Sequence, residues 1–214
     1  MKVGVIDFGV GNLGSVMRAL EELCVSPVLV DRAVDMHAND CLILPGVGNF
    51  SDCVRLLEAG GWVDALRDEV LGYNRPLLGI CVGMQLLADF GTEGVGMGRG
   101  DETPGLGLIP GRVENLRTLG CAQRVPHVGW NEITCTQKSS RLLEGIPDGT
   151  DFYFVHSYAF VPEDSSDVHA TADYGASFAA VVQRGNVWGV QFHPEKSSRA
   201  GFKLFSNFLS VSIC

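Results

Sequence analysis

The chain has 214 residues, of which 46% are hydrophobic and 19% are charged, and its formal net charge is −9. This composition indicates a globular protein with ample core rather than a disordered chain, and the negative charge argues against nucleic acid and anionic membranes as partners. No apolar run approaches the roughly 18 residues that a membrane-spanning helix needs.

The N-terminus and the cysteines predict a protein of the reducing cytoplasm. Residues 1–7 read as a first strand and lack the apolar core of a secretory signal. The seven cysteines are odd in number, form no C-x-x-C pair, and in several cases lie in apolar periodic segments. We therefore expect free thiols, with neither a disulfide framework nor a metal site.

The first half of the chain alternates apolar strands with helical patterns. Apolar residues recur at helical spacing over 13–23, and two short buried strands follow at 28–30 and 41–44. The helical pattern over 51–71 is broken at Gly60, where we expect two pieces or a kink. This alternation predicts a parallel sheet with helices on both faces.

The second half consists mainly of strand patterns. Residues 91–111 are rich in glycine and predict a long surface loop that contains one short strand. The strands expected after it lie at 125–134, 152–161, 169–174, 179–183 and 187–192. An amphipathic helix begins near Ser197. Because no linker or repeat is present, we predict one α/β domain over residues 1–214, with a mixed, mostly parallel sheet.

Cys81 lies in the pentapeptide Gly-Ile-Cys-Val-Gly, after an apolar strand and before a helical pattern. Glycines two residues before and two after the cysteine are typical of a nucleophile elbow. A thiol at such a corner lies at a helix N-terminus, where the helix dipole favours thiolate. The alternative is a buried cysteine that acts only as a small apolar residue, but the flanking glycines favour the nucleophile.

A histidine near the C-terminus provides the base that a cysteine nucleophile needs. His193 follows a strand pattern and precedes Pro194 and Glu195. The proline removes a backbone donor and ends the strand ladder. Glu195 is therefore expected to hold one imidazole nitrogen while the other faces Cys81. For the other four histidines, solvated or core positions are expected.

The segment from Gly9 to Gly14 supports a different class of function. It matches the G-x-G-x-x-G pattern, lies between a strand and a helix, and is followed by Asp31. This spacing is typical of dinucleotide binding and so of an NAD-linked oxidoreductase. However, Asp7 and Phe8 end the preceding strand beside the expected phosphate site, and the second run of βα units is missing. The oxidoreductase is therefore the weaker hypothesis.

Taken together, these motifs resemble those of the class I (triad) glutamine amidotransferase family, along essentially the whole chain. Within that family, the chain is most similar to the glutaminase subunits of imidazole glycerol phosphate synthases. The Pro-Gly-Val-Gly, Gly-Trp-Asn and His-Pro-Glu-Lys-Ser sequences narrow the resemblance to that subfamily. The stretches that carry the resemblance are 9–12, 44–50, 78–87, 105–111, 127–131, 153–158 and 189–197.

The resemblance implies a reaction and a site, with no cofactor. Cys81 attacks the carboxamide of L-glutamine, His193 transfers the proton to the leaving ammonia, Glu195 orients His193, and water hydrolyses the thioester. It also implies roles for two sets of residues. The backbone oxyanion donors are expected at Val47, Gly48 and Val82, and the glutamine-binding residues at Gly48, Gln85, Ser157 and Tyr158.

Val47 raises an expectation about regulation. Many members of the family have glycine where this chain has valine, and a β-branched residue resists the backbone angles that glycine accepts. We expect the oxyanion hole to form only when a partner has bound its own substrate, so that the chain alone hydrolyses glutamine poorly.

The resemblance also implies a partner that consumes the ammonia. This is a separate (β/α)₈-barrel cyclase, bound as a heterodimer, which makes imidazole glycerol phosphate and an aminoimidazole carboxamide ribotide in histidine biosynthesis. The docking face is expected at Gly9, Val10, Gly11, Asn12, Trp130 and Lys196. Three alternatives remain open: the glutaminase subunit of another triad amidotransferase, a cysteine peptidase or hydrolase of the same architecture, and a non-catalytic binding module.

Overall fold

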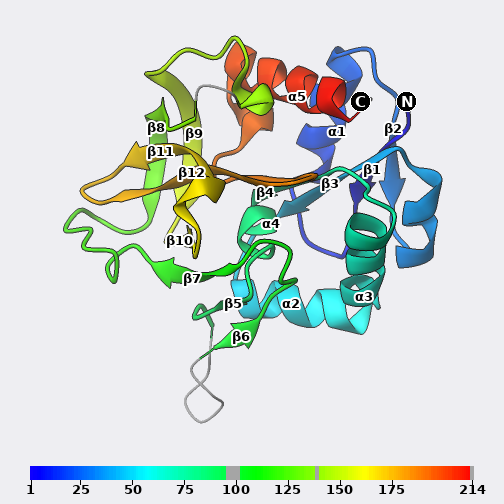
Figure 1. Cartoon of the computed structure of the whole chain (residues 1–214), viewed down its shortest axis with the longest axis horizontal. Helices are drawn as coiled ribbons and strands as arrows, with labels where there is room; N and C mark the ends of the chain where they lie inside the picture. The colour runs from blue at the N-terminus through cyan, green and yellow to red at the C-terminus, as the bar shows by residue number, and fades with distance from the viewer. Residues whose placement is uncertain (95–101, 138–139, 213–214) are drawn as a thin grey trace.

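A nine-stranded sheet forms the centre of the molecule (Figure 1). The structure is a computed structural model that describes residues 1–94, 102–137 and 140–212. The strands of the sheet are β1 (Val3–Ile6), β2 (Pro27–Val30), β3 (Cys41–Gly46), β4 (Leu77–Cys81), β8 (His127–Cys135), β9 (Thr150–His156), β11 (Val168–Asp173), β12 (Ser177–Arg184) and β13 (Val187–Val190). Their order is β2-β1-β3-β4-β13-β12-β11-β8-β9.

The sheet is parallel in one half and antiparallel in the other. All pairings from β2 to β13 are parallel, and those from β13 to β9 are antiparallel. The predicted α/β class and mixed sheet are thus confirmed. The parallel strands come from the first half of the chain and from β13, whose pairing with β4 brings residues near 190 beside residues near 80.

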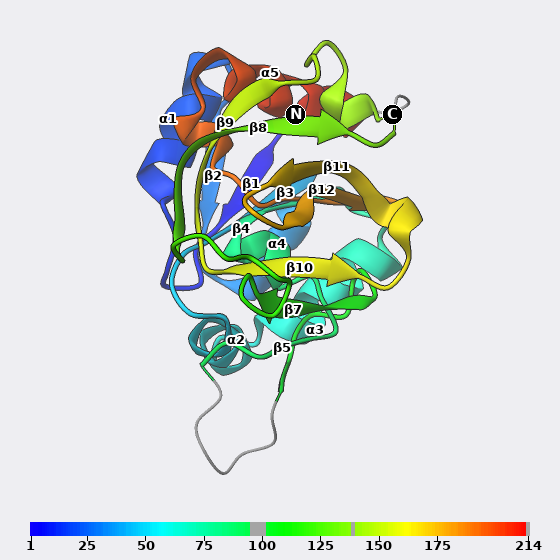
Figure 2. The same ribbon diagram turned by 90° about the vertical axis from the view of Figure 1, so that its left-hand side faces the viewer.

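Helices cover both faces of this sheet (Figure 2). Helices α1 (Leu13–Glu22) and α5 (Ser198–Val211) lie on one face, and α2 (Phe50–Ala59), α3 (Trp62–Arg67) and α4 (Val82–Gln85) lie on the other. The predicted break at Gly60 is confirmed, because α2 ends before it and α3 begins after Gly61, whose φ is +68°. Within the described ranges, no helix is long and apolar enough to cross a membrane. The short turns are η1 (Ala33–Ala38), η2 (Asp68–Gly72), η3 (Arg141–Leu143), η4 (Ser165–Asp167) and η5 (Pro194–Lys196).

A second, smaller sheet lies on the same side as α2 and α3 (Figure 2). It contains β5 (Phe90–Gly91), β6 (Thr103–Pro104), β7 (Gly111–Asn115) and β10 (Tyr158–Pro162), in the order β10-β7-β5-β6. Strand β7 was not predicted. Residues 95–101 of the predicted surface loop lie outside the described residues.

The prediction of one strand over 152–161 is wrong. The apolar pattern continues through this segment, but the chain changes partner at Ser157. His156 still pairs with His127 of β8, whereas Tyr158 pairs with Asn115 of β7 in the second sheet. The side-chain pattern cannot show a change of partner, because both strands are half-buried.

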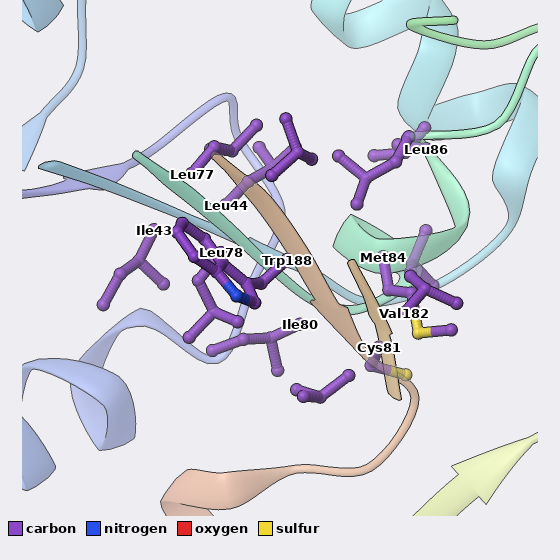
Figure 3. Close-up of a cluster of buried hydrophobic side chains, with 14 of the residues drawn as sticks. Ile43, Leu44, Leu77, Leu78, Ile80, Cys81, Met84, Leu86, Val182 and Trp188 are labelled. Carbon is purple, nitrogen blue, oxygen red and sulfur yellow. The ribbon is translucent and has the colours of Figure 1, made fainter. Parts of the chain in front are cut away.

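A cluster of buried apolar side chains surrounds β4, which lies between β3 and β13 (Figure 3). Leu77, Leu78 and Ile80 are buried there and pack with Trp188 and other apolar side chains. This packing fixes the position of the last residue of the strand, Cys81, at the carboxyl edge of the parallel strands, where ligands of open α/β sheets bind.

Candidate active site

Cys81 occupies the sharp corner between β4 and α4. Its φ is +55° and its ψ is −111°, a backbone conformation that costs a non-glycine residue about 1–3 kcal/mol and that clusters at functional sites. Helix α4 contains only four residues, so the predicted contribution of a helix dipole is small. A thiolate at this corner must be stabilised by side chains from elsewhere in the fold.

The two glycines flanking Cys81 are required by close packing. A Cβ atom at Gly83 would lie 1.8 Å from the carbonyl oxygen of Leu44, and one at Gly79 would lie 2.5 Å from the carbonyl oxygen of Gly83. The backbones of β3, β4 and α4 therefore meet without side chains between them. This contact holds the corner in place and explains the glycine pattern seen in the sequence.

His193 and Glu195 meet Cys81 at this edge of the sheet. His193 Nδ1 lies 2.8 Å from Glu195 Oε1. His193 and Cys81 line the same cavity, and the Cys81 side chain is close enough to raise the pKa of the imidazole. Because Nδ1 is occupied by the carboxylate, Nε2 is the nitrogen left to interact with the sulfur. The backbone of His193 is anchored as well, since its N–H donates to the Tyr153 carbonyl and its carbonyl accepts from Ser197 Oγ.

The surroundings of His193 favour its protonated form. Burial lowers the pKa of the imidazole. The interactions with Cys81 and Glu195 raise it by more than burial lowers it, so the net pKa is about 9. At neutral pH the ring therefore retains its proton between a carboxylate and a sulfur atom. Such a pair supplies a nucleophile and an acid at the same time.

Two glutamines connect the sulfur atom to the neighbouring strands. Gln191, which is fully buried, places Nε2 3.8 Å from Cys81 Sγ, within the range of a hydrogen bond to sulfur. Its Oε1 accepts from Gln85 Nε2 at 3.0 Å, and the same Gln85 nitrogen donates to the Tyr158 carbonyl at 2.8 Å. Both amide orientations are therefore fixed, and Gln191 donates to the sulfur.

A small cavity opens beside Cys81. Its volume is about 170 Å³, below the range of drug-sized pockets, which begins at about 300 Å³. Every residue predicted to bind glutamine or to stabilise an oxyanion lies in its wall. The lining consists of Val47, Gly48, Cys81, Val82, Gln85, Glu93, Val155, His156, Ser157, Tyr158 and His193.

The segment after β3 brings backbone groups to this cavity. Gly48 has a φ of +101°, which only glycine adopts easily, whereas Val47 is not among the residues with positive φ. The Val47 carbonyl accepts a hydrogen bond from Cys53 Sγ at 3.5 Å. The unusual backbone angle therefore falls on Gly48 and not on the β-branched residue before it.

Sequence reasoning missed three side chains at the site. Gln191 is one. Glu93 lines the cavity, accepts from the Phe50 N–H at 3.0 Å, and has its pKa raised by burial. Asn12 donates from Nδ2 to Glu195 Oε1 at 3.0 Å. Only Gln191 carried a local signal, since it lies two residues before His193 and directly follows β13.

The residues predicted for the docking face lie in two groups, one around Tyr153 and one at the start of α1. Trp130 is 54% exposed and packs edge-on against Tyr153, and Lys196 Nζ lies 5.7 Å above the same ring. Val128 and Val155, which pair across β8 and β9, add exposed apolar surface. Gly9 is exposed, and Val10 and Gly11 are partly exposed, whereas the side chain of Asn12 is turned toward Glu195.

The structure argues against the dinucleotide hypothesis. Asn12 is the N-cap of α1, and its side chain holds the carboxylate of Glu195 beside the start of that helix. The fingerprint assigns this place to a pyrophosphate, which a neighbouring negative charge repels.

Comparison of the sequence with known families gives one match along most of the chain. The family is described as "Glutamine amidotransferase class-I", and the match covers residues 4–211. Among curated relatives, the imidazole glycerol phosphate synthase subunit HisH of Pelagibacter ubique is 40% identical, covering 99% of this chain and 100% of the relative. The HisH subunit of Rhodospirillum rubrum is 46% identical, covering 98% of each.

Solved structures show the same fold. A structure titled "Crystal structure of glutamine amidotransferase" superposes with a TM-score of 0.75 at 22% identity, covering 99% of both chains. Another, the structure of PurLQS from Thermotoga maritima, superposes with a TM-score of 0.73 at 17% identity, covering 98% of both chains.

Proposed function

Because this chain belongs to the glutamine amidotransferase class-I family, we propose that it is the glutaminase subunit of an imidazole glycerol phosphate synthase. The observation that carries the proposal is that Cys81 and His193, which is itself held by Glu195, line one cavity of amino-acid size and interact closely enough to raise the pKa of the imidazole. The substrate is L-glutamine, and the products are glutamate and ammonia.

Cys81, His193 and Glu195 carry the chemistry. The sulfur attacks the side-chain carboxamide carbon of glutamine, and a C–S bond forms. His193 then gives its Nε2 proton to the amide nitrogen, the C–N bond breaks, and ammonia leaves. In the second half of the reaction His193 takes a proton from water, which attacks the thioester and releases glutamate. Glu195 keeps the imidazole oriented through both halves.

The oxyanion that forms in each half needs backbone donors. The Val82 N–H, next to the nucleophile, supplies one, and the Val47–Gly48 segment in the opposite wall supplies the other. The expected gating of this segment by the partner stays a prediction. The Val47 carbonyl, which accepts from Cys53 Sγ, is one of the groups that link the segment to α2.

The polar wall of the cavity fits the amino-acid end of glutamine. Both donor positions of Gln85 are used inside the protein, so its Oε1 is the atom available to accept from the substrate. The Glu93 carboxylate in the same wall provides a counter-charge for the α-ammonium group. Gly48, Ser157 and Tyr158 complete the binding surface.

The ammonia is consumed by a separate (β/α)₈-barrel cyclase in the cytoplasm. The partner binds over the exposed apolar surface of β8 and β9, formed by Val128, Trp130 and Val155, with Lys196 at its edge and the turn at Gly9–Gly11 beside it. Such a contiguous apolar patch is typical of a protein interface. The cyclase combines the ammonia with its own substrate to give imidazole glycerol phosphate and an aminoimidazole carboxamide ribotide.

Comparing two nitrogen sources tests this function. The chain and its cyclase are mixed with the cyclase substrate, and synthesis is followed with glutamine or with ammonium salt. Cys81→Ala is expected to abolish glutamine-dependent synthesis and to leave ammonia-dependent synthesis intact. Equal synthesis from glutamine in the wild type and in Cys81→Ala would contradict the proposal, as would failure of the wild type to use glutamine.

A further inference from the structure

Two buried histidines outside the triad contact each other beside the cavity. His127 on β8 and His156 at the end of β9 are cross-strand partners, 3% and 6% exposed respectively. His127 Nδ1 lies 3.0 Å from His156 Nε2, and His156 also lines the cavity. The proposed reaction uses neither of them.

The direction of every hydrogen bond in this pair is fixed by its two ends. A carbonyl oxygen only accepts, so His156 Nδ1 donates to the Tyr158 carbonyl, at 2.9 Å. Nε2 of the neutral His156 ring then accepts from His127 Nδ1. At the other end, Asn131 Nδ2 donates to the Asp173 carbonyl at 2.8 Å and faces His127 Nε2 at 3.5 Å.

The surroundings of the pair keep both rings neutral. His127 stacks on Tyr174 with ring centroids 4.0 Å apart, and His156 packs against Phe178 at 4.8 Å. Burial lowers the pKa of His127 to about 4 and that of His156 to about 3. Each ring therefore carries one proton, and the chain of donors runs in one direction, from Asn131 to Tyr158.

This series of hydrogen bonds ends at the Tyr158 carbonyl oxygen, which also holds a side chain of the substrate site. The Tyr158 carbonyl accepts from His156 Nδ1 and from Gln85 Nε2. If the first donor is lost, Gln85 is the one side-chain donor that remains on this carbonyl, and its position is then set by Gln85 and by the pairing of β10 with β7. The Gln85 amide donates to this carbonyl and to Gln191 Oε1, so the direction of Gln85 Oε1 depends in part on where the Tyr158 carbonyl is held.

We infer that His127 and His156 are positioning residues, which hold the Tyr158 carbonyl and thereby aim the Gln85 amide at glutamine. This inference rests on the proposed function, because the ligand that Gln85 meets is the substrate of that reaction. The histidines do not contact the reacting atoms, so they are expected to influence glutamine binding more than the chemical step.

Three variants in the complex with the cyclase test the inference. His156→Leu removes the donor to Tyr158, and we expect the KM for glutamine to rise about tenfold while kcat stays within about threefold, since one buried hydrogen bond is lost. His156→Asn places an amide donor near the position of Nδ1, and its KM is expected to stay within about threefold of the wild type. His169→Leu is the control, because it removes a half-buried histidine of β11 that does not line the cavity.

The KM values of these variants for glutamine can contradict the inference in several ways. A folded His156→Leu protein with the KM of the wild type overturns the inference. An equal rise in KM for His156→Asn and His156→Leu also overturns it, because packing of the ring would then be the cause. If His156→Leu does not fold, His127→Leu is measured in its place, because it removes the donor to His156 Nε2. An unchanged KM for glutamine in His127→Leu would also overturn the inference. Absence of glutamine hydrolysis in both the wild type and His169→Leu would instead remove the proposed function, and this inference with it.

Discussion

Asn12 donates a 3.0 Å hydrogen bond to Glu195 across 183 residues of sequence. The oxygen it contacts, Oε1, is the same one that His193 Nδ1 approaches. From the sequence, Asn12 was expected on the docking face. That expectation stays a prediction. The structure shows that the Asn12 side chain supports the carboxylate of Glu195, so that one atom of Glu195 is held from two sides.

The position of Asn12 predicts that its substitution lowers the catalytic rate and leaves the affinity for the partner nearly unchanged. In Asn12→Leu, Glu195 loses a donor and orients His193 less well, so kcat for glutamine is expected to fall about tenfold at saturating cyclase. The dissociation constant of the complex, measured by calorimetry, is expected to change little. An unchanged kcat with a much weaker complex would show that Asn12 serves docking alone.

The raised pKa of His193 predicts the alkaline limit of the reaction. The imidazolium persists up to a pH of about 9, where its pKa lies, so kcat is expected to hold through neutral pH and to fall above that value. Because the pKa is above the ordinary 6.5, the stability that this pairing contributes is present below pH 6.5 and is lost as the pH rises through about 9.

The contribution of Glu195 to the pKa of His193 can be measured by comparing the pH–rate profiles of the wild type and Glu195→Gln. Glu195 is one of the groups that raise the pKa of His193, so Glu195→Gln is expected to move the alkaline limb to lower pH. It is also expected to lower kcat by about 10²- to 10⁴-fold, as in other triads. A pH–rate profile whose alkaline limb is the same in both proteins would assign that limb to another group.

Gln191 is expected to control the reactivity of the nucleophile. Gln191→Met removes the amide that faces Cys81 Sγ, and alkylation of Cys81 by iodoacetamide at pH 7 is expected to slow about tenfold, because the sulfur loses a hydrogen-bond donor. Gln183→Met, on the partly exposed part of β12, is the matched control. Equal alkylation rates in all three proteins would rule out this hydrogen bond as a source of reactivity.

The elbow predicts a large effect of a single methyl group on stability. In Gly83→Ala the Cβ atom would meet the Leu44 carbonyl oxygen at 1.8 Å, and backbone must move on one side or the other. We expect the free energy of unfolding in urea to fall by about 3 kcal/mol or more. Gly72→Ala, with open space around its Cβ position, is expected to change it by less than about 1 kcal/mol. Similar values for the two variants would contradict the close contact.

The sequence predicted those parts of the site whose position is marked by neighbouring residues in the chain. Cys81 is marked by glycines that the tight corner requires, and His193 by a proline that ends a strand. The pairing of β13 with β4 then brings the two side chains together. By contrast, Glu93 and Asn12 reach the site through contacts that no local periodicity encodes.

The errors in the predicted fold have a similar origin. The apolar pattern of 152–161 is continuous, and only the choice of partner divides it into β9 and β10. The helical pattern that follows Cys81 forms only the one-turn helix α4, because the carbonyls of Leu87 and Ala88 accept from Leu108 and Gly107 in the connection toward the second sheet. Both features depend on tertiary contacts, which override local propensity.

Covalent labelling of the nucleophile is the measurement that bears most directly on the proposed reaction. The complex is treated with a diazoketone analogue of glutamine, and the modified residue is located by mass spectrometry of peptides. We predict modification at Cys81 alone, slowed by added glutamine and lost in His193→Ala. Modification of Cys53 or another thiol, or labelling of Cys81 that glutamine does not slow, would contradict a glutaminase that works through Cys81 and His193.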